Sequence, residues 1–127
     1  MIDAIQTAIA GLRVSALRFG VAANNIANAP ASGGVEPYDG YSPQRLDQST
    51  DARGGVRGIV QPIGRPVLPA YAPTDASANA DGVFGMPNIS LPAEFVDVAV
   101  ARRSYEANVA VLETTNEMMR LLVDREV

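Results

Sequence analysis

The 127-residue sequence contains no cysteine and no histidine, and its ten basic residues are all arginine. The absence of cysteine excludes a disulfide scaffold, thiolate catalysis and cysteine-based metal sites. The absence of histidine removes the commonest general base and the commonest zinc ligand. Serine and threonine then have no imidazole to activate them as nucleophiles. We therefore expect no catalytic residues, no cofactor and no metal, and we expect that the chain is not an enzyme.

Positive charge and long apolar runs are also scarce. The formal net charge is −4 at pH 7 and no segment is strongly basic, so we expect no nucleic-acid partner. No stretch reaches the roughly 20 apolar residues that a membrane-spanning helix needs. Asp3 stands where a signal peptide has basic residues, and Gln6 and Arg13 interrupt any apolar run. If the protein is exported, we expect a route without a cleaved signal.

The sequence does contain two segments with helical periodicity, one near each end of the chain. The first helix is predicted over residues 3–28 and ends before Pro30, which disfavours further helix. Its large apolar residues recur at steps of three and four, the spacing of a coiled-coil stripe. The stripe consists of Ile2, Ile5, Ile9, Leu12, Ala16, Phe19, Ala23 and Ile26. The face away from it consists of small residues: Ala4, Ala8, Gly11, Ser15 and Ala22.

The second helix is predicted to begin after Ser90, the expected N-cap, and to run to about Asp124. Pro92 falls in the first turn, where a missing N–H group costs nothing. Glu94 and Asp97 complement the positive end of the helix dipole. The apolar stripe of this helix consists of Phe95, Val98, Tyr105, Val109, Leu112, Met119 and Val123, with the polar residues Arg102 and Asn116 at two further positions.

Residues 30–87, between the helices, show no helical period and hold most of the prolines and glycines. Their prolines restrict any strands to sheet edges or extended connections. Asp81-Gly82 is typical of a turn, so a short hairpin through residues 83–84 is expected. Three further short strands are predicted, at residues 41–46, 56–61 and 67–71.

Together these elements predict a mainly α fold, in which the two helices pack as an antiparallel coiled-coil hairpin with a short irregular β-like insert between them. The helical domain would be discontinuous, comprising residues 1–29 and 88–127, and the insert would comprise residues 30–87. The first helix has few charged residues, and a single partner helix cannot cover a helix that is apolar or small on every face. The sequence therefore predicts a subunit that is completed by its neighbours.

The charges predict how the two helices align. Glu113 and Glu117 are like charges four residues apart near the negative end of a helix dipole, which is unfavourable without a nearby cation. Arg13 and Arg18 are the basic residues of the first helix. Aligning the two chain ends places Arg18 near Glu106 and Arg13 near Glu113. We therefore predict ion pairs at these positions, within the subunit or to a neighbouring one.

Two other features of the helices are a set of neighbouring charges and a pair of interior glycines. Arg102 and Arg103 lie four and three residues from Glu106, which favours ion pairs on an ordinary polar helix surface. Gly11 and Gly20 each weaken a helix by about 1 kcal/mol relative to alanine. These glycines indicate either a close approach of another backbone or a helix that packing supports well enough to tolerate them.

One cluster in the insert has the spacing of a metal loop. Ser77, Asn79 and Asp81 follow the first half of a calcium-binding loop, but Asn88 stands where the loop requires a bidentate glutamate. Turn formation explains the cluster better. Carboxylates such as Asp75 are interpreted as solvated turn residues, because no rigid element holds them at the spacing that glycoside hydrolysis needs.

Several motifs resemble those of bacterial flagellar rod and hook proteins. The first helix ends in Ala23-Asn24-Asn25-Ile26-Ala27-Asn28, which is similar to an Ala-Asn-Asn-hydrophobic-Ala-Asn signature of that family. The family usually continues with a Thr-x-Gly-aromatic stretch, whereas Pro30-Ala31-Ser32-Gly33-Gly34 stands here. The C-terminal motif of the family is resembled by Pro87-Asn88-Ile89-Ser90-Leu91, Glu94, Val96, Arg103-Ser104-Tyr105-Glu106-Ala107-Asn108 and Glu117-Met118-Met119.

The segment before that motif narrows the resemblance. Tyr71, Pro73, Ala80-Asp81-Gly82 and Val83 resemble the corresponding segment of proximal-rod subunits. The short insert also argues against distal-rod and hook proteins, which carry larger middle domains. The resemblance covers residues 2–28 and 67–123 and is weak between them.

The resemblance implies a structural axial subunit of the basal-body rod, which assembles into a helical tube that transmits motor torque and lines the export channel. It implies export through the flagellar type III apparatus, a place in the basal body across the periplasm, and contacts with other copies and other rod subunits, with no small-molecule substrate. The expected assembly interface consists of Ile5, Ile9, Leu12, Phe19, Asn24, Asn25, Ile26, Asn28, Phe95, Arg103, Tyr105, Asn108, Val109, Leu112 and Met119.

Two other hypotheses are compatible with the residues. One is an adaptor or export partner that folds as a monomeric helical hairpin and binds one target. The other is a small periplasmic hydrolase, for which the sequence offers little support. Concentration-dependent assembly separates the rod subunit from the adaptor.

Overall fold

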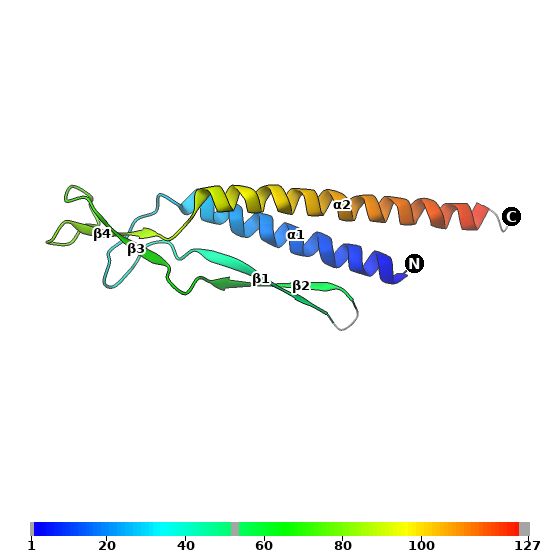
Figure 1. Ribbon diagram of the computed structural model, residues 1–127, viewed down its shortest axis with the longest axis horizontal. Helices are drawn as coiled ribbons and strands as arrows, with labels where there is room; N and C mark the ends of the chain where they lie inside the picture. The colour runs from blue at the N-terminus through cyan, green and yellow to red at the C-terminus, as the bar shows by residue number, and fades with distance from the viewer. Residues whose placement is uncertain (1, 52–53, 125–127) are drawn as a thin grey trace.

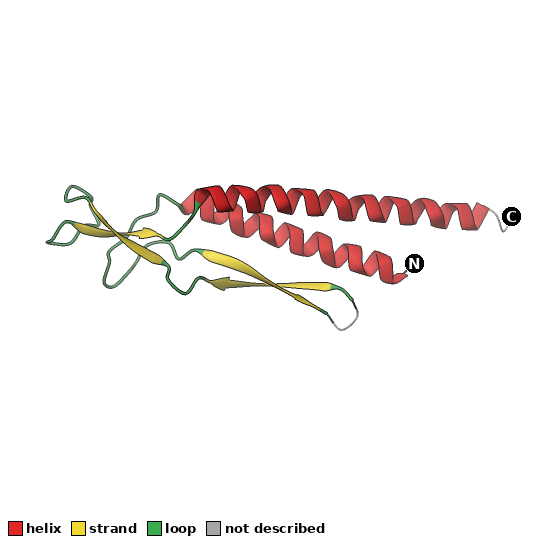
Figure 2. Cartoon of the chain, in the orientation of Figure 1, coloured by secondary structure: helices red, strands yellow, loops and turns green. Residues whose placement is uncertain are grey.

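The computed structural model describes residues 2–51 and 54–124. Two helices, α1 (Ile2–Asn28) and α2 (Leu91–Asp124), lie side by side and run in opposite directions, as Figures 1 and 2 show. The start of α1 and the end of α2 therefore lie at the same end of the molecule. The chain between the helices forms β1 (Gln44–Thr50), β2 (Val56–Pro62), β3 (Val67–Tyr71) and β4 (Val83–Pro87).

Both helices have bounds close to those that the sequence predicts. α1 ends at Asn28, two residues before Pro30. At the start of α2, the N–H group of Glu94 donates to the carbonyl of Ser90 at 3.0 Å, so Ser90 precedes the first turn as an N-cap residue does. The two long helices and the small β insert confirm the mainly α architecture.

The strands form two separate antiparallel hairpins, β1–β2 and β3–β4. β1 was predicted from Tyr41, but it begins at Gln44 and extends to Thr50. Tyr41 binds Asn25 of α1 instead of a partner strand, and Pro43, whose carbonyl accepts from the N–H group of Ile63 at 3.1 Å, has no N–H group to donate. β2 and β3 lie where the sequence placed them, and β2 is one residue longer.

The β1–β2 hairpin lies along α1. A side-chain carbon built on Gly58 of β2 would lie 3.5 Å from both Leu17 and Val14 of α1. Gly55, in the turn of the hairpin, similarly lies against Ala10. Gln44, at the other end of the hairpin, is bound by Asn25. The hairpin thus covers one flank of α1 over most of that helix.

The β3–β4 hairpin extends beyond the other end of the helices (Figure 1). Its register runs from Val67 opposite Pro87 to Tyr71 opposite Val83, and Gly82 before β4 has a φ of +75°, as a tight turn requires. The turn expected at Asp81-Gly82 is present, but residues 83–84 pair with β3 across the connection 72–82 rather than in the short hairpin that was expected. Gly33 and Gly85 exchange backbone hydrogen bonds of 3.0 and 2.8 Å, which attach the segment after α1 to β4.

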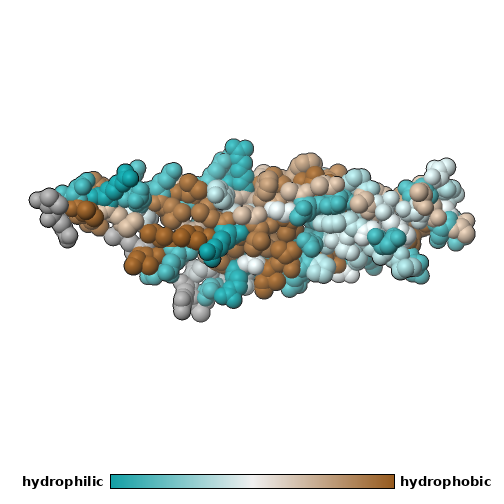
Figure 3. All heavy atoms as spheres, turned by 180° about the vertical axis from the view of Figure 1, so that it is seen from behind, coloured by the Kyte–Doolittle hydropathy of each residue, from teal (hydrophilic) through white to brown (hydrophobic). Residues whose placement is uncertain are grey.

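The buried core is small. Its apolar residues among those described are Ala8, Val14, Val21, Ala22 and Ala101. Many large apolar side chains lie on the surface instead, and seen from behind in Figure 3 they gather over the helices and the middle of the molecule. The β3–β4 end is mostly hydrophilic or neutral in colour in the same view. The hydrophobic surface of this chain is therefore concentrated on its helical half.

Candidate functional site

Most of the fully buried residues of α1 and α2 are small. Ala8, Ser15 and Ala22 of α1 are buried, and so are Ala101 and Thr115 of α2. These α1 residues belong to the small face that the sequence analysis placed away from the helix–helix contact. That placement was wrong, because small side chains let two helix backbones approach more closely than large ones do.

One glycine takes part in this close approach. A side-chain carbon built on Gly11 would lie 2.6 Å from the amide of Asn108 on α2, whereas one built on Gly20 meets nothing within 4 Å. Asn108 itself donates to the carbonyl of Ser104 at 2.7 Å. Close approach therefore explains Gly11, and Gly20 is a glycine that the helix tolerates.

The aromatic residues of the two predicted stripes lie beside the helix contact, whereas aliphatic stripe residues such as Leu12 and Leu112 are half-buried. Phe19 and Phe95 are 51 % and 59 % exposed, and Tyr105 is 46 % exposed. Ala16 and Phe19 of α1 line an apolar groove together with Val98 and Tyr105 of α2. The two stripes thus meet along one side of the helix pair. We call the space lined by Ala16, Phe19, Val98 and Tyr105 the outer groove.

The other residues of the expected assembly interface are distributed along the same helices. Ile9 and Asn24 are exposed, as is Arg103 on α2. Asn28 is half-buried, and its side chain donates to the carbonyl of Asn24 within α1 at 2.8 Å. Half-buried positions are occupied by Ile5, Leu12, Ile26, Asn108, Val109, Leu112 and Met119.

Asn25 is the only one of these residues that is fully buried in the described chain, with 1 % of its surface exposed. Its amide nitrogen donates to the carbonyl of Gln44 at 2.7 Å and to Glu94 Oε1 at 2.9 Å. Its amide oxygen accepts from the hydroxyl of Tyr41 at 2.9 Å and from the N–H group of Gln44 at 3.1 Å. Both donors and both acceptor positions of the side chain are therefore used.

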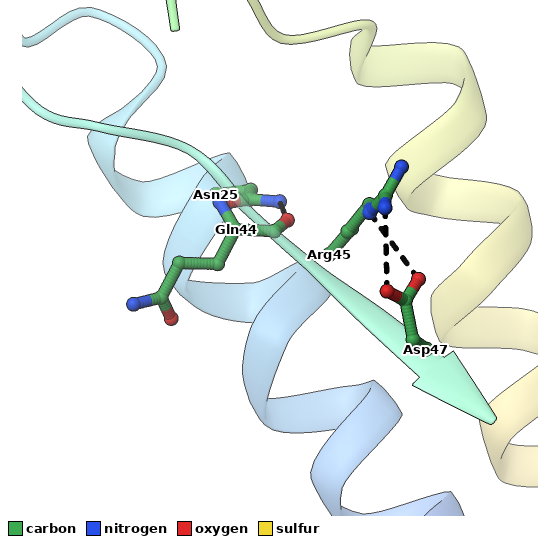
Figure 4. A network of polar contacts seen from close by, with 4 residues as sticks. All are labelled: Asn25, Gln44, Arg45 and Asp47. Carbon is green, nitrogen blue, oxygen red and sulfur yellow. Dashed lines mark hydrogen bonds and ion pairs between the residues drawn. The ribbon is translucent and has the colours of Figure 1, made fainter. Parts of the chain in front are cut away.

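These bonds join three parts of the fold, which we call the Asn25 junction: the end of α1, the segment entering β1 and the start of α2. Figure 4 shows Asn25 against the backbone of Gln44, with Arg45 and Asp47 farther along β1. Arg45 and Asp47 form an ion pair at 3.2 Å on the exposed side of the strand. The sequence motif contained Asn25, but its spacing gave no sign of these partners.

The charge of Glu94 is disfavoured at this junction. Burial raises the pKa of Glu94 above its ordinary value of 4.5, and the charge of Asp97 raises it further, while the hydrogen bond from Asn25 lowers it. Burial likewise raises the pKa of the Tyr41 hydroxyl, with the charge of Glu94 adding to the effect. The junction therefore favours the protonated forms of both groups.

The ion pairs correct the predicted helix register. Arg18 Nη1 lies 3.9 Å from Asp97 on α2, and not near Glu106. Glu106 instead pairs with Arg102 at 2.8 Å, as its spacing of four residues predicted. The prediction aligned the chain ends, whereas the Asn25–Glu94 contact fixes the register at the opposite end of the helices. Among the described residues Arg13 and Arg103 have no ion pair, so a pair between Arg13 and a neighbouring subunit stays a prediction.

The calcium-like cluster of the insert forms turns. The side-chain oxygen of Asn79 accepts from the N–H groups of Asp81 and Val83, each at 3.0 Å. Asp75 accepts from the N–H group of Ser77 at 2.8 Å. These oxygens stabilise the backbone of the loop, which agrees with the interpretation of the cluster as turn residues.

Comparison with known proteins decides the family. Residues 80–125 match the family described as the flagellar basal body rod FlgEFG protein C-terminal. The chain is 32% identical to the flagellar basal-body rod protein FlgC of Salmonella typhimurium, over 94% of this chain and 92% of that protein. The chain belongs to the FlgC family. It is also 38% identical to FlgC of Yersinia enterocolitica, over 87% of this chain and 88% of that protein, and 29% identical to FlgC of Agrobacterium fabrum, over 95% and 91%.

Membership of the FlgC family confirms the resemblance seen in the motifs, and it makes the chain a structural subunit of the flagellar basal-body rod. A rod subunit is not an enzyme, so the expectation from the missing histidine and cysteine is confirmed by the family. Within residues 2–51 and 54–124, neither helix is both long and apolar enough to cross a bilayer.

Proposed function

We propose that the chain assembles with other copies and other rod subunits into a helical tube, in which α1 and α2 form an antiparallel coiled coil that lines the export channel and transmits torque. The observation that carries this proposal is the exposure of large apolar side chains along both helices, Phe19, Phe95 and Tyr105 among them. A soluble monomer rarely exposes such continuous apolar surface unless a partner covers it.

The interface of the proposed assembly consists of the large apolar residues of both helices together with the motif residues Asn24, Asn28, Arg103 and Asn108. Residues 1–29 and 88–127 act as the helical assembly domain, and residues 30–87 act as the insert that contacts neighbouring parts of the basal body. Asn25 contributes indirectly, because its hydrogen bonds set the position of the insert on the helices.

The subunit reaches its place in the proposed scheme through the flagellar type III export apparatus, without a cleaved signal peptide, and the assembled rod crosses the periplasm. An export route that carries unfolded or partly folded chains suits a subunit with a small core, because little free energy is needed to unfold it.

A complementation experiment tests the proposal. The chain is expressed in bacteria of its own species whose rod subunit has been deleted, and swimming, assembled basal bodies and the mass of the exported protein are measured. We expect restored swimming and an exported protein with its N-terminal residues intact. A chain that accumulates as a monomer bound to one export protein, with no copy in purified basal bodies, would instead identify a helical-hairpin adaptor.

The pairing of the helices in the assembled rod is tested with introduced cysteines, since the chain has none of its own. Ser15→Cys on α1 and Ala101→Cys on α2 line the same groove and should form an intramolecular disulfide in basal bodies. The matched pair Gly20→Cys and Ala101→Cys should not, because Gly20 contacts nothing on α2. Equal cross-linking of the two pairs would contradict a fixed helix pairing.

A further inference from the structure

The β1–β2 hairpin, which lies along α1 (Figure 1), has an inner and an outer strand. β1 is the inner strand, because Arg45 and Leu46 line a cavity of about 130 Å³ together with Glu94 of α2. On the other side of the hairpin, Val60 of β2 lines an open groove with residues of α1 and with Gln44. β2 is therefore the strand whose free edge faces away from the helix pair.

The outer edge of β2 carries backbone groups without a partner. In an antiparallel pair, alternate residues bond to the other strand and the residues between them point outward. The bond from the N–H group of Ile63 to the carbonyl of Pro43, at 3.1 Å, shows that odd-numbered residues of β2 bond to β1. The N–H and carbonyl groups of Val56, Gly58 and Val60 therefore point away from β1. In the described part of the chain, none of these groups makes a hydrogen bond elsewhere.

An open groove of about 600 Å³ runs beside this edge, and we call it the α1–β2 groove. It is lined by Arg13, Leu17, Gly20, Asn24 and Val60, among others. Leu17 and Val60 are 42 % and 37 % exposed, and a side-chain carbon built on Gly20 meets nothing within 4 Å. From residue 13 to residue 24 the helix rises ~17 Å, which is the length of about five residues of extended chain.

We infer that β2 accepts an extended segment of another protein as an added strand, with alternate side chains of that segment packed in the α1–β2 groove. This inference deepens the proposed role of the insert and so rests on the proposed function. In this mode of recognition, main-chain hydrogen bonds provide affinity and the pockets for alternate side chains provide specificity.

The composition of β2 is compatible with strand addition. Edge strands that must stay unpaired are commonly protected by inward-pointing charges, by proline or by a bulge. The residues of β2 that face α1 are Val56, Gly58 and Val60, and none of them is charged. Proline occurs only at the last position, Pro62, where it ends the row of available N–H groups. The register with β1 is regular throughout.

Arg13 determines the charge that the added segment should carry. Gly55 lies against Ala10 and Gly58 lies against Val14, so Arg13 is level with the start of β2. Antiparallel pairing places the C-terminal end of the added segment at that point. Among the described residues Arg13 has no ion pair, so a carboxylate at that end would provide one. We expect a segment of alternating apolar residues with an acidic residue near its C-terminal end.

The strands of this chain do not fit that description, which is why the segment is assigned to another protein. β2 carries Arg57 and no carboxylate, so two paired β2 edges would leave both groove arginines without an acid. β3 and β4 also contain no acidic residue. β1 contains Asp47, but this carboxylate pairs with Arg45 and the strand is already paired with β2.

A synthetic probe tests the inference in the full chain. The probe is the C-terminally amidated peptide Thr-Val-Thr-Val-Thr-Glu-Thr with an N-terminal fluorescein. In the proposed register its valines lie opposite Val60 and Gly58, and its glutamate lies opposite Val56. One control peptide has lysine in place of glutamate. The other is N-methylated at both valines, which keeps the side chains but removes N–H groups that donate to β2. Fluorescence anisotropy measures binding at chain concentrations up to about 1 mM, the range of weak contacts.

Four variants complete the test, and circular dichroism checks their folding. Arg13→Glu reverses the charge in the groove, and Arg120→Glu makes the same change at an exposed position on α2. Val60→Pro removes an outward N–H group without removing a bond to β1, and edge positions of this kind tolerate proline. Val60→Thr keeps that N–H group. If Val60→Pro does not fold, the N-methylated probe makes the same test on the unsubstituted chain.

We expect the probe to bind the unsubstituted chain, Val60→Thr and Arg120→Glu with similar affinity. N-methylation of the probe or Val60→Pro should weaken binding at least tenfold. The lysine peptide should bind at least threefold more weakly than the probe, and Arg13→Glu should reverse that preference. Bound probe should slow hydrogen exchange of the Val56, Gly58 and Val60 amides, measured by NMR, while the Arg57 and Ile59 amides, which already bond to β1, change little.

Several results would overturn the inference. No binding of the probe up to about 1 mM would mean that the edge does not accept a strand. Equal binding of the N-methylated probe would mean that the groove holds side chains without strand pairing. Slow exchange of the three outward amides without probe, increasing with chain concentration, would mean that a second copy covers the edge. An unchanged preference for glutamate in Arg13→Glu would exclude the assigned charge. If the unsubstituted chain gives any of these results but still restores swimming in the deletion strain, the proposed function stands and only the strand addition is wrong.

Discussion

Replacing Asn25 with alanine would test whether the Asn25 junction holds the insert on the helices. The substitution removes all four hydrogen bonds of the side chain, at 2.7 to 3.1 Å, and leaves the carbonyl and N–H groups of Gln44, the Tyr41 hydroxyl and Glu94 without this partner. The residue is 1 % exposed, so water does not replace the side chain in the folded structure without rearrangement.

The size of the effect follows from these partners. The three neutral hydrogen bonds contribute about 1 kcal/mol each, and the bond to the carboxylate about 1.5–3 kcal/mol. Tyr41 and Glu94 are only half-buried, so water satisfies part of their hydrogen bonding after the substitution. We therefore expect the free energy of unfolding to fall by about 3–4 kcal/mol. That loss is a large part of the ~5–15 kcal/mol that stabilises a typical domain.

Urea unfolding followed by circular dichroism measures this loss, with Asn28→Ala as the matched control. Asn28 lies in the same motif, but its side chain donates within its own helix, to Asn24. Its replacement should change the free energy of unfolding by less than about 1 kcal/mol. If Asn25→Ala and Asn28→Ala cost the same, the junction does not stabilise the fold and the argument from its four hydrogen bonds is wrong.

Other substitutions test separate parts of the structure. Because the pKa of Glu94 is raised in the folded chain, the folded state binds more protons and should lose stability as pH rises from 4.5 through that raised pKa. Unfolding of Glu94→Gln, measured across that pH range, should lack this loss, and an unchanged pH profile would exclude Glu94 as its source. Gly20→Ala should raise the free energy of unfolding by about 1 kcal/mol, whereas Gly11→Ala should lower it by about 1 kcal/mol because the new carbon displaces Asn108. Equal effects in thermal unfolding would mean that Gly11 is not a contact point. Leu12 and Val109 are half-buried in the free chain, so Leu12→Asp and Val109→Asp should each leave the free chain folded. Both variants should prevent rod assembly, because the assembled interface would bury an unpaired charge. Normal swimming with either variant would show that these positions are not buried in the rod.

The sequence predicted the helices well because local signals fix them. Pro30 limits the end of α1, and the Ser90-Leu91-Pro92 sequence marks the start of α2, so the predicted and observed bounds agree closely. The strand at residues 67–71 and the turn at Asp81-Gly82 were likewise predicted, but the pairing of β3 with β4 across residues 72–82 was not. The predicted start of β1 was less accurate. The segment entering the strand binds Asn25, and this contact joins parts of the chain that are distant in sequence.

The faces of the helices show where sequence reasoning stops. Periodicity identifies which residues share a face, but it does not identify which face meets the partner helix. Periodicity favoured the large apolar stripe for that role, whereas in the structure Ala8, Ser15 and Ala22 are the more deeply buried residues. Gly11, a small residue in a helix interior, was the signal that pointed to the correct face. The four partners of Asn25 had no comparable signal, because three of them belong to residues 41–44 and one to α2.

The use of small residues within the subunit has a consequence for assembly. A helix pair that buried its large side chains internally would be more stable as a monomer and would leave little apolar surface for neighbours. Here many large side chains, Phe19, Phe95 and Tyr105 among them, stay exposed, so their hydrophobic free energy remains for the proposed contacts between subunits. In the proposed assembly, a contact between two free copies must first offset about 4–15 kcal/mol of lost translational and rotational freedom. A subunit that joins an assembly and meets two neighbours loses that freedom once and gains two contacts. In the proposed assembly, free pairs should then be rare while the assembled structure is stable.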